Sequence, residues 1–152
     1  CQTLGPRKRF RYQRFEGRIV ARQIVFTPKA AKPPAAYSQA VKAGNLLFIS
    51  GQVAFVPGTD TLIVNNIAEE THQVMKNLQA ILTEAGIDFG NIVKTTIFLS
   101  DMSLFASVNE VYGQYFGLSS ESANTGYPAR ETIAVKGLPK NVNVEISMIA
   151  TI

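Results

Sequence analysis

The sequence predicts an α+β fold, in which one mixed β-sheet carries two helices on the same face. The chain has 152 residues, a length that suits a single domain with one core. Its 46% of hydrophobic and 17% of charged residues are typical of a globular protein. Strand-like segments precede, separate and follow two segments of helical periodicity, and this order favours one sheet with both helices on one side.

Three short strands are predicted at the start of the folded body. Residues 24–26 are β-branched or aromatic, and Pro28 ends that segment soon afterwards. Residues 38–42 and 46–55 follow as two more strands, joined by a turn that contains Gly44. We therefore expect the sheet to open with a hairpin or meander.

The first helix is predicted over residues 67–85. Asn66 has the short polar side chain that caps helix N-termini, and Glu69 stands where the acid of a capping box is found. Gly86 follows as a C-terminal stop signal. The apolar face of this helix consists of Val74, Leu78, Ile81, Leu82 and Ala85.

The second half of the chain predicts a strand, a helix and two more strands. Residues 92–99 are rich in β-branched side chains, and Asp101 or Ser103 can cap the helix that follows. The last two strands are expected over residues 131–135 and 142–151. The core positions of the second helix are Leu104, Val108, Val111 and Tyr115.

The sheet face that points away from the helices has no further element of the chain to cover it. If that face carries apolar residues, copies of the same chain should bury it. Side chains alternate in the last strand, so Glu145 is the only acid on its mostly polar face. A solvent-facing acid is the simpler interpretation, but in a subunit cleft Glu145 could orient a water or move a proton.

The composition excludes several classes of site. With one cysteine, Cys1, and one histidine, His72, the chain can form neither an internal disulfide nor a common Cys/His zinc site by itself. The sequence contains no glycine-rich phosphate loop, no G-x-S-x-G motif and no apolar run long enough to span a bilayer. We expect chemistry without metal or cofactor, no membrane partner, and a partly exposed His72.

The basic charge belongs to one end of the chain. Seven Arg and Lys against one Glu give residues 1–22 a charge of +6, so the total of +4 leaves −2 on residues 23–152. We interpret residues 1–22 as a flexible or processed extension and residues 23–152 as the domain. The extension could bind nucleic acid, whereas the body has no charge excess for it. A cytoplasmic location is expected, or a mitochondrion or plastid if the extension is a transit remnant.

Arg130 and Asn109 are candidate ligand-binding residues, as are Tyr37, Ser50 and Gly51. Arg130 begins a strand, where its guanidinium could hold a carboxylate with two hydrogen bonds. Asn109 lies beside the apolar face of the second helix, and Gly51 permits close backbone approach to a ligand. From the pattern alone, the simpler explanations are a surface cation for Arg130, a solvated amide for Asn109, a packed tyrosine for Tyr37 and a β-bulge at Ser50-Gly51.

Six segments resemble the Rid/YjgF family in order and spacing, over residues 24–152. The most specific is Tyr127-Pro128-Ala129-Arg130 together with the downstream Glu145. The others are Tyr37-Ser38-Gln39-Ala40, Phe48-Ile49-Ser50-Gly51-Gln52, Ile92-Val93-Lys94-Thr95-Thr96, Val108-Asn109 and Leu138-Pro139-Lys140.

This resemblance implies a chorismate-mutase-like fold and a homotrimer around a central barrel, with active clefts between subunits. It implies hydrolysis of 2-iminopropanoate and 2-iminobutanoate, which arise from enamines, to 2-oxo acids and ammonia without a cofactor. Arg130 would clamp the substrate carboxylate and Glu145 would activate water, while Tyr37, Ser50, Gly51 and Asn109 would line the pocket.

The chain departs from the family pattern at two places. Ala35-Ala36 stand where Gly-Pro is common before the tyrosine, and Thr132 stands where a cysteine is frequent in some members. Two alternatives to the deaminase stay open at this point. One is a small-ligand-binding or chaperone-like trimer without turnover, and the other is a ribonuclease or translation inhibitor that acts on RNA.

Overall fold

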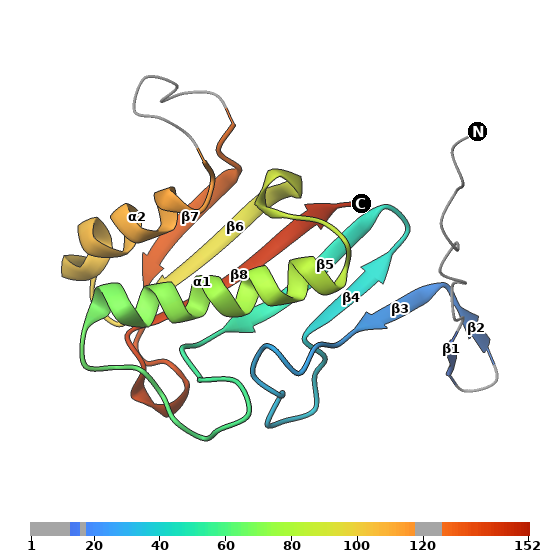
Figure 1. Cartoon of the computed structure of the whole chain (residues 1–152), viewed down its shortest axis with the longest axis horizontal. Helices are drawn as coiled ribbons and strands as arrows, with labels where there is room; N and C mark the ends of the chain where they lie inside the picture. The colour runs from blue at the N-terminus through green and yellow to red at the C-terminus, as the bar shows by residue number, and fades with distance from the viewer. Residues whose placement is uncertain (1–12, 16–17, 118–125) are drawn as a thin grey trace.

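The computed structural model describes residues 13–15, 18–117 and 126–152, and its main body is a six-stranded sheet (Figure 1). The strand order is β3-β4-β5-β8-β6-β7. Neighbouring strands run antiparallel, except β6 and β7, which are parallel. The strands are β3 (Arg22–Val25), β4 (Ala40–Ala43), β5 (Leu46–Gln52), β6 (Ile92–Leu99), β7 (Ala129–Ala134) and β8 (Val144–Thr151).

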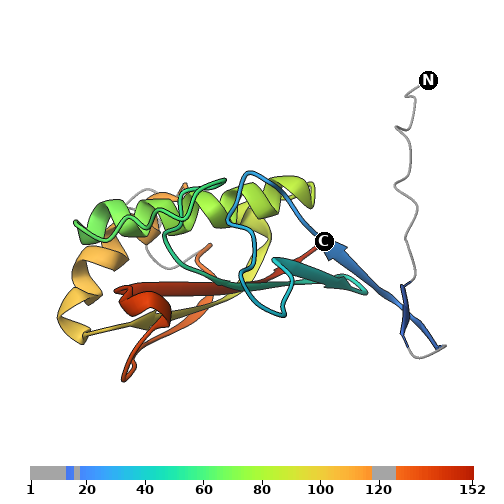
Figure 2. The same cartoon turned by 90° about the horizontal axis from the view of Figure 1, so that it is seen from below.

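Two helices, α1 (Ile67–Glu84) and α2 (Phe105–Gln114), lie on the same face of this sheet (Figure 2). They form one layer and the sheet forms the other, with the core between them. The predicted mixed sheet with two helices on one face is therefore confirmed. The homotrimer stays a prediction.

The helix α1 begins and packs as the sequence predicts. The side chain of Asn66 accepts hydrogen bonds from the backbone amides of Ala68 and Glu69, at 2.9 and 3.2 Å. These bonds satisfy two of the amides that have no partner within the helix. The helix buries a continuous apolar face, made by Val74, Met75, Leu78, Ile81 and Leu82.

The alternation predicted for the last strand sets the two faces of the sheet. In β8 the residues Val144, Ile146, Met148 and Ala150 are buried against the helix layer. Glu145 and the other odd-numbered residues are only partly buried, as expected for the opposite face. Truncating a buried leucine beneath α1 to alanine would cost about 2–5 kcal/mol.

Several strand ends differ from the prediction, two of them at a register shift or a turn. β4 begins at Ala40, and the side chain of the buried Gln39, just before it, bonds to the backbone of Thr27 and Ala31. A register shift between Ile49 and Gln52 disturbs β5, which ends at Gln52. β8 begins at Val144, after the 3-10 turn Pro139–Asn141.

The cap of the second helix was predicted at the wrong place. Asp101 accepts a hydrogen bond from the amide of Ser103 at 2.8 Å and so caps a short 3-10 helix, Met102–Leu104. The helix α2 then begins at Phe105 without a side-chain cap, because the 3-10 turn already leads into it. It ends at Gln114, one residue before Tyr115.

The extension expected over residues 1–22 contains two strands near its end. β1 (Gln13–Phe15) pairs antiparallel with β2 (Arg18–Val20), apart from the main sheet (Figure 1). Arg22 pairs with Ala43, so the main sheet begins at the last residue of that extension. Residues 1–12 lie outside the described part of the chain.

Candidate functional site

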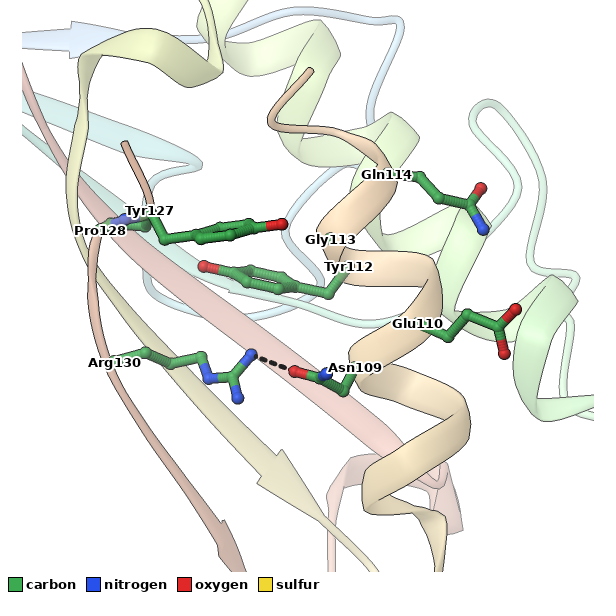
Figure 3. Close-up of a pocket in the computed structure, with 8 residues that line it drawn as sticks. All are labelled: Asn109, Glu110, Tyr112, Gly113, Gln114, Tyr127, Pro128 and Arg130. Carbon is green, nitrogen blue, oxygen red and sulfur yellow. Dashed lines mark hydrogen bonds between the residues drawn. The ribbon is translucent and has the colours of Figure 1, made fainter. Parts of the chain in front are cut away.

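Arg130 belongs to the edge strand β7, and its side chain extends toward the helix α2 (Figure 3). Its Nη1 donates a hydrogen bond to Oδ1 of Asn109 at 2.9 Å. The centre of the guanidinium is 5.0 Å from the ring centroid of Tyr112 and 5.6 Å from that of Phe105. An amide and two aromatic faces thus hold a group that is always charged and well suited to bind carboxylates.

A cavity of about 710 Å³ opens beside this arginine, large enough for a small organic acid. Tyr127 and Pro128 come from the segment before β7, while α2 supplies the opposite wall (Figure 3). The residues that line the cavity are Asn109, Glu110, Tyr112, Gly113, Gln114, Tyr127, Pro128 and Arg130.

Glu145 belongs to a second group of residues on the helix-free face of the sheet. Its carboxylate lies directly over Gly51, where an added Cβ would come within 2.7 Å of Oε1. Burial raises the pKa of Glu145 above its ordinary value. The pKa of Tyr37 is also raised, mainly by burial and then by the negative charge of Glu145. Burial therefore favours the neutral form of this carboxyl, which lies beside Gly51 and the hydroxyl-bearing Tyr37 and could donate as well as accept a proton.

Gly51 and Ser50 both have defined neighbours in this second group. The side chain of Glu145 approaches Gly51 closely, and the predicted contact of Gly51 with a ligand stays a prediction. The hydroxyl of Ser50 donates to the carbonyl oxygen of Ser38 at 2.6 Å and so fastens β5 to the segment before β4. Tyr37 is 48% exposed, and it directly follows Ala35-Ala36.

The two groups occupy opposite faces of the sheet within one chain. Arg130 pairs with Thr95, whose side chain is buried under the helices, whereas Glu145 pairs with Phe98 on the helix-free face. Glu145 is also not among the residues that line the cavity beside Arg130. One chain therefore brings together Arg130 with Asn109, and Glu145 with Gly51 and Tyr37, but it does not join the two groups.

Sequence reasoning missed the aromatic residues around Arg130. Phe105 and Tyr112 lie on the same side of α2 as Asn109, four and three residues away from it. That spacing is the available signal, because residues three and four apart share one side of a helix. Tyr112 is 3% exposed and lies beside the predicted core position Val111.

Two further residues of interest have defined surroundings. His72 is half-buried, and its Nδ1 is 2.8 Å from the hydroxyl of Tyr115, which ties α1 to the end of α2. Thr132 has a buried Oγ1 without a hydrogen-bond partner within the described part of the chain. Over residues 13–15, 18–117 and 126–152, no three His, Cys, Asp or Glu side chains cluster as metal ligands, and no helix is long and apolar enough to cross a membrane.

The fold and the site define a small α+β protein with a cavity beside an arginine at the edge of its sheet. The model of the Endoribonuclease L-PSP family, which comprises the Rid/YjgF proteins, matches residues 27–152. The chain belongs to this family, as its sequence motifs indicated.

Known relatives match nearly the whole described body. A RutC family protein of Pyrococcus abyssi is 43% identical over 131 residues, which are 86% of this chain and 98% of that protein. The human 2-iminobutanoate/2-iminopropanoate deaminase is 40% identical over 129 residues, 85% of this chain and 89% of its own. The crystal structure of RidA from Psychrobacter superposes with a TM-score of 0.77 at 40% identity, covering 86% of this chain and 99% of RidA.

Proposed function

We propose that this protein hydrolyses small reactive 2-imino acids, such as 2-iminopropanoate and 2-iminobutanoate, to 2-oxo acids and ammonia. The observation that carries the proposal is the guanidinium of Arg130, held by Asn109 and two rings at the mouth of a cavity. It is a preorganised site for a small carboxylate. The name of the human relative at 40% identity supports the imine as the reacting group.

The reaction needs a carboxylate clamp and one acid–base group. Water adds to the C=N carbon, and the C–O bond forms as a proton reaches the nitrogen. The C–N bond of the resulting carbinolamine then breaks, so that ammonia leaves and the 2-oxo acid remains. Glu145, with its raised pKa, would accept the proton of the attacking water and return it to the departing nitrogen.

We propose further that the active cleft forms between two subunits of a homotrimer. Arg130 and Glu145 lie on opposite faces of one chain's sheet, so a substrate held by Arg130 would meet a Glu145 from a neighbouring copy. The helix-free face also exposes apolar side chains that a neighbour would cover, among them Phe48 at 44% and Ile133 at 47% exposure.

A complementation experiment tests the activity and the shared cleft together. Arg130→Ala and Glu145→Gln are each expected to abolish acceleration of ammonia release from freshly generated 2-iminobutanoate. Random co-assembly of the two variants should restore about one quarter of wild-type activity, since each cleft takes its two residues from different chains. No restoration would place both residues in one chain's site, and no acceleration by the wild-type trimer would favour a binding protein without turnover.

RNA cleavage or translation inhibition is the second candidate, favoured by the family name Endoribonuclease L-PSP and by the +6 charge of residues 1–22. Deleting residues 1–22 separates the two. Electrostatic RNA binding should disappear with the extension and weaken steeply with salt, whereas imine hydrolysis should persist. RNA cleavage that survives the deletion would instead assign that activity to the body.

A further inference from the structure

Tyr112 links the helix α2 to the strand position beside Arg130. Its hydroxyl donates a hydrogen bond to Oγ1 of Thr95 at 3.0 Å, and both side chains are buried. Thr95 is the residue of β6 that pairs with Arg130 of β7, so the two side chains are neighbours on the helix side of the sheet. The tyrosine hydroxyl is therefore anchored one strand away from the backbone that carries the arginine.

The ring of Tyr112 is the better fixed of the two aromatic faces that contact Arg130. Its centroid is 5.0 Å from the guanidinium carbon, and Tyr112 is 3% exposed. Figure 3 shows this ring between Arg130 and Tyr127. The ring of Phe105 is 5.6 Å away, and Phe105 is 37% exposed. A buried ring with an anchored hydroxyl has little freedom to move, so it restrains the cation that rests against it.

The hydrogen bond between Arg130 and Asn109 fixes only one end of the guanidinium. Asn109 accepts a hydrogen bond from Nη1, and among residues 13–15, 18–117 and 126–152 the guanidinium has no second hydrogen-bond partner. To bind a carboxylate with two parallel hydrogen bonds, the guanidinium must have the correct orientation of its plane as well as the correct position. The ring of Tyr112 supplies the surface that can set this plane.

We propose that Tyr112, anchored by Thr95, is a positioning residue that orients Arg130 toward the carboxylate of the substrate. This inference rests on the proposed function, because it assigns Arg130 to carboxylate binding. Tyr112 itself is not required to touch the reacting atoms. Loosening it should therefore weaken carboxylate binding and leave the proton transfers at the imine almost unchanged.

The test removes the hydroxyl bond from each side. Tyr112→Phe keeps the ring but loses the donor, and Thr95→Val keeps the volume but loses the acceptor. Each should raise KM for 2-iminobutanoate about 3–10-fold, the effect of one lost hydrogen bond, while kcat changes less than about 2-fold. The double variant should be no worse than either single variant, because both remove the same bond.

Tyr115→Phe is the matched control. Its hydroxyl, near the end of the same helix, bonds to His72 and does not contact Arg130. It should lower thermal stability as Tyr112→Phe does, without the rise in KM. Equal KM changes in the two tyrosine variants, or unchanged KM in Tyr112→Phe and Thr95→Val, would overturn the inference.

A binding measurement separates positioning from general damage and from failure of the proposed function. Calorimetry should show that the wild-type protein binds 2-oxobutanoate more tightly than 2-oxobutanamide, and that Tyr112→Phe loses about 3–10-fold of this preference. Equal weakening of both ligands would refute positioning. If the wild type shows the preference but no turnover, the deaminase proposal fails while the role of Tyr112 stands.

Discussion

Replacing Gly51 with alanine should separate the activity of this protein from its stability. A Cβ at this position would lie 2.7 Å from Oε1, 2.9 Å from Cδ and 3.0 Å from Cγ of Glu145. Non-bonded atoms pack at about 3.5 Å, so the carboxylate would have to move by roughly 0.8 Å. The obstructing atoms belong to a flexible side chain on a partly open face, which can yield without disturbing the core.

The expected magnitudes follow from that displacement. Alanine restricts the unfolded chain and stabilises by about 0.4–1 kcal/mol, while an off-rotamer glutamate costs about 0.5–1.5 kcal/mol. The free energy of unfolding should therefore change by less than about 1 kcal/mol, or roughly 2–4 °C in Tm for a chain of this size. A displacement approaching 1 Å of an acid–base group can lower kcat/KM by about 10–100-fold.

The assay compares ammonia release from 2-iminobutanoate with thermal unfolding of the same sample. Gly137→Ala is the matched control, because nothing lies within 4 Å of a Cβ added there. It should leave both quantities unchanged. Full activity in Gly51→Ala would refute the assignment of the Glu145 carboxylate, in its observed position, to catalysis.

Three further perturbations test individual groups. Asn109→Asp would place a carboxylate against Arg130 that competes with the substrate, so steady-state kinetics should show KM raised at least about 10-fold. Burial raises the pKa of Glu70, so the neutral carboxyl contributes stability below about pH 4.5, and this contribution is lost as the pH rises through the folded-state pKa. Urea unfolding at several pH values should therefore show that the free energy of unfolding falls less with rising pH in Glu70→Gln than in the wild type. Lys94→Ala should change stability by less than about 1 kcal/mol in the same assay, because the ion pair with Glu131 is 40–48% exposed and screened.

The parts of the fold that were predictable are those encoded locally. The cap at Asn66 and the apolar stripe of α1 depend on residues within a few positions of one another. The two faces of β8 follow from simple alternation. The register shift at Ser50-Gly51 and the early end of β5 depend on the partner strand, which no local pattern specifies.

The candidate site was predictable in its parts and not in their arrangement. Arg130 and Asn109 are 21 positions apart, and only the packing of α2 beside β7 brings them into contact. Gly51 and Glu145 meet because β5 and β8 are neighbours, although they stand far apart in the sequence. Tyr112 could be found only by asking which residues share a helix side with Asn109.

The helix-free face gives a physical reason for the shared cleft that we propose. Glu145, Phe98 and Ile133 form one row across β8, β6 and β7, and Phe48 pairs with Ile149 along the same face. The apolar side chains of this row are exposed to water in a single chain. Covering them with another copy would stabilise the assembly by about 25 cal/mol per Å² of apolar surface buried. The cover would also dehydrate Glu145, whose pKa burial already raises within the single chain. Assembly would thereby strengthen the property that suits Glu145 to proton transfer, and stability and catalysis would depend on the same interface.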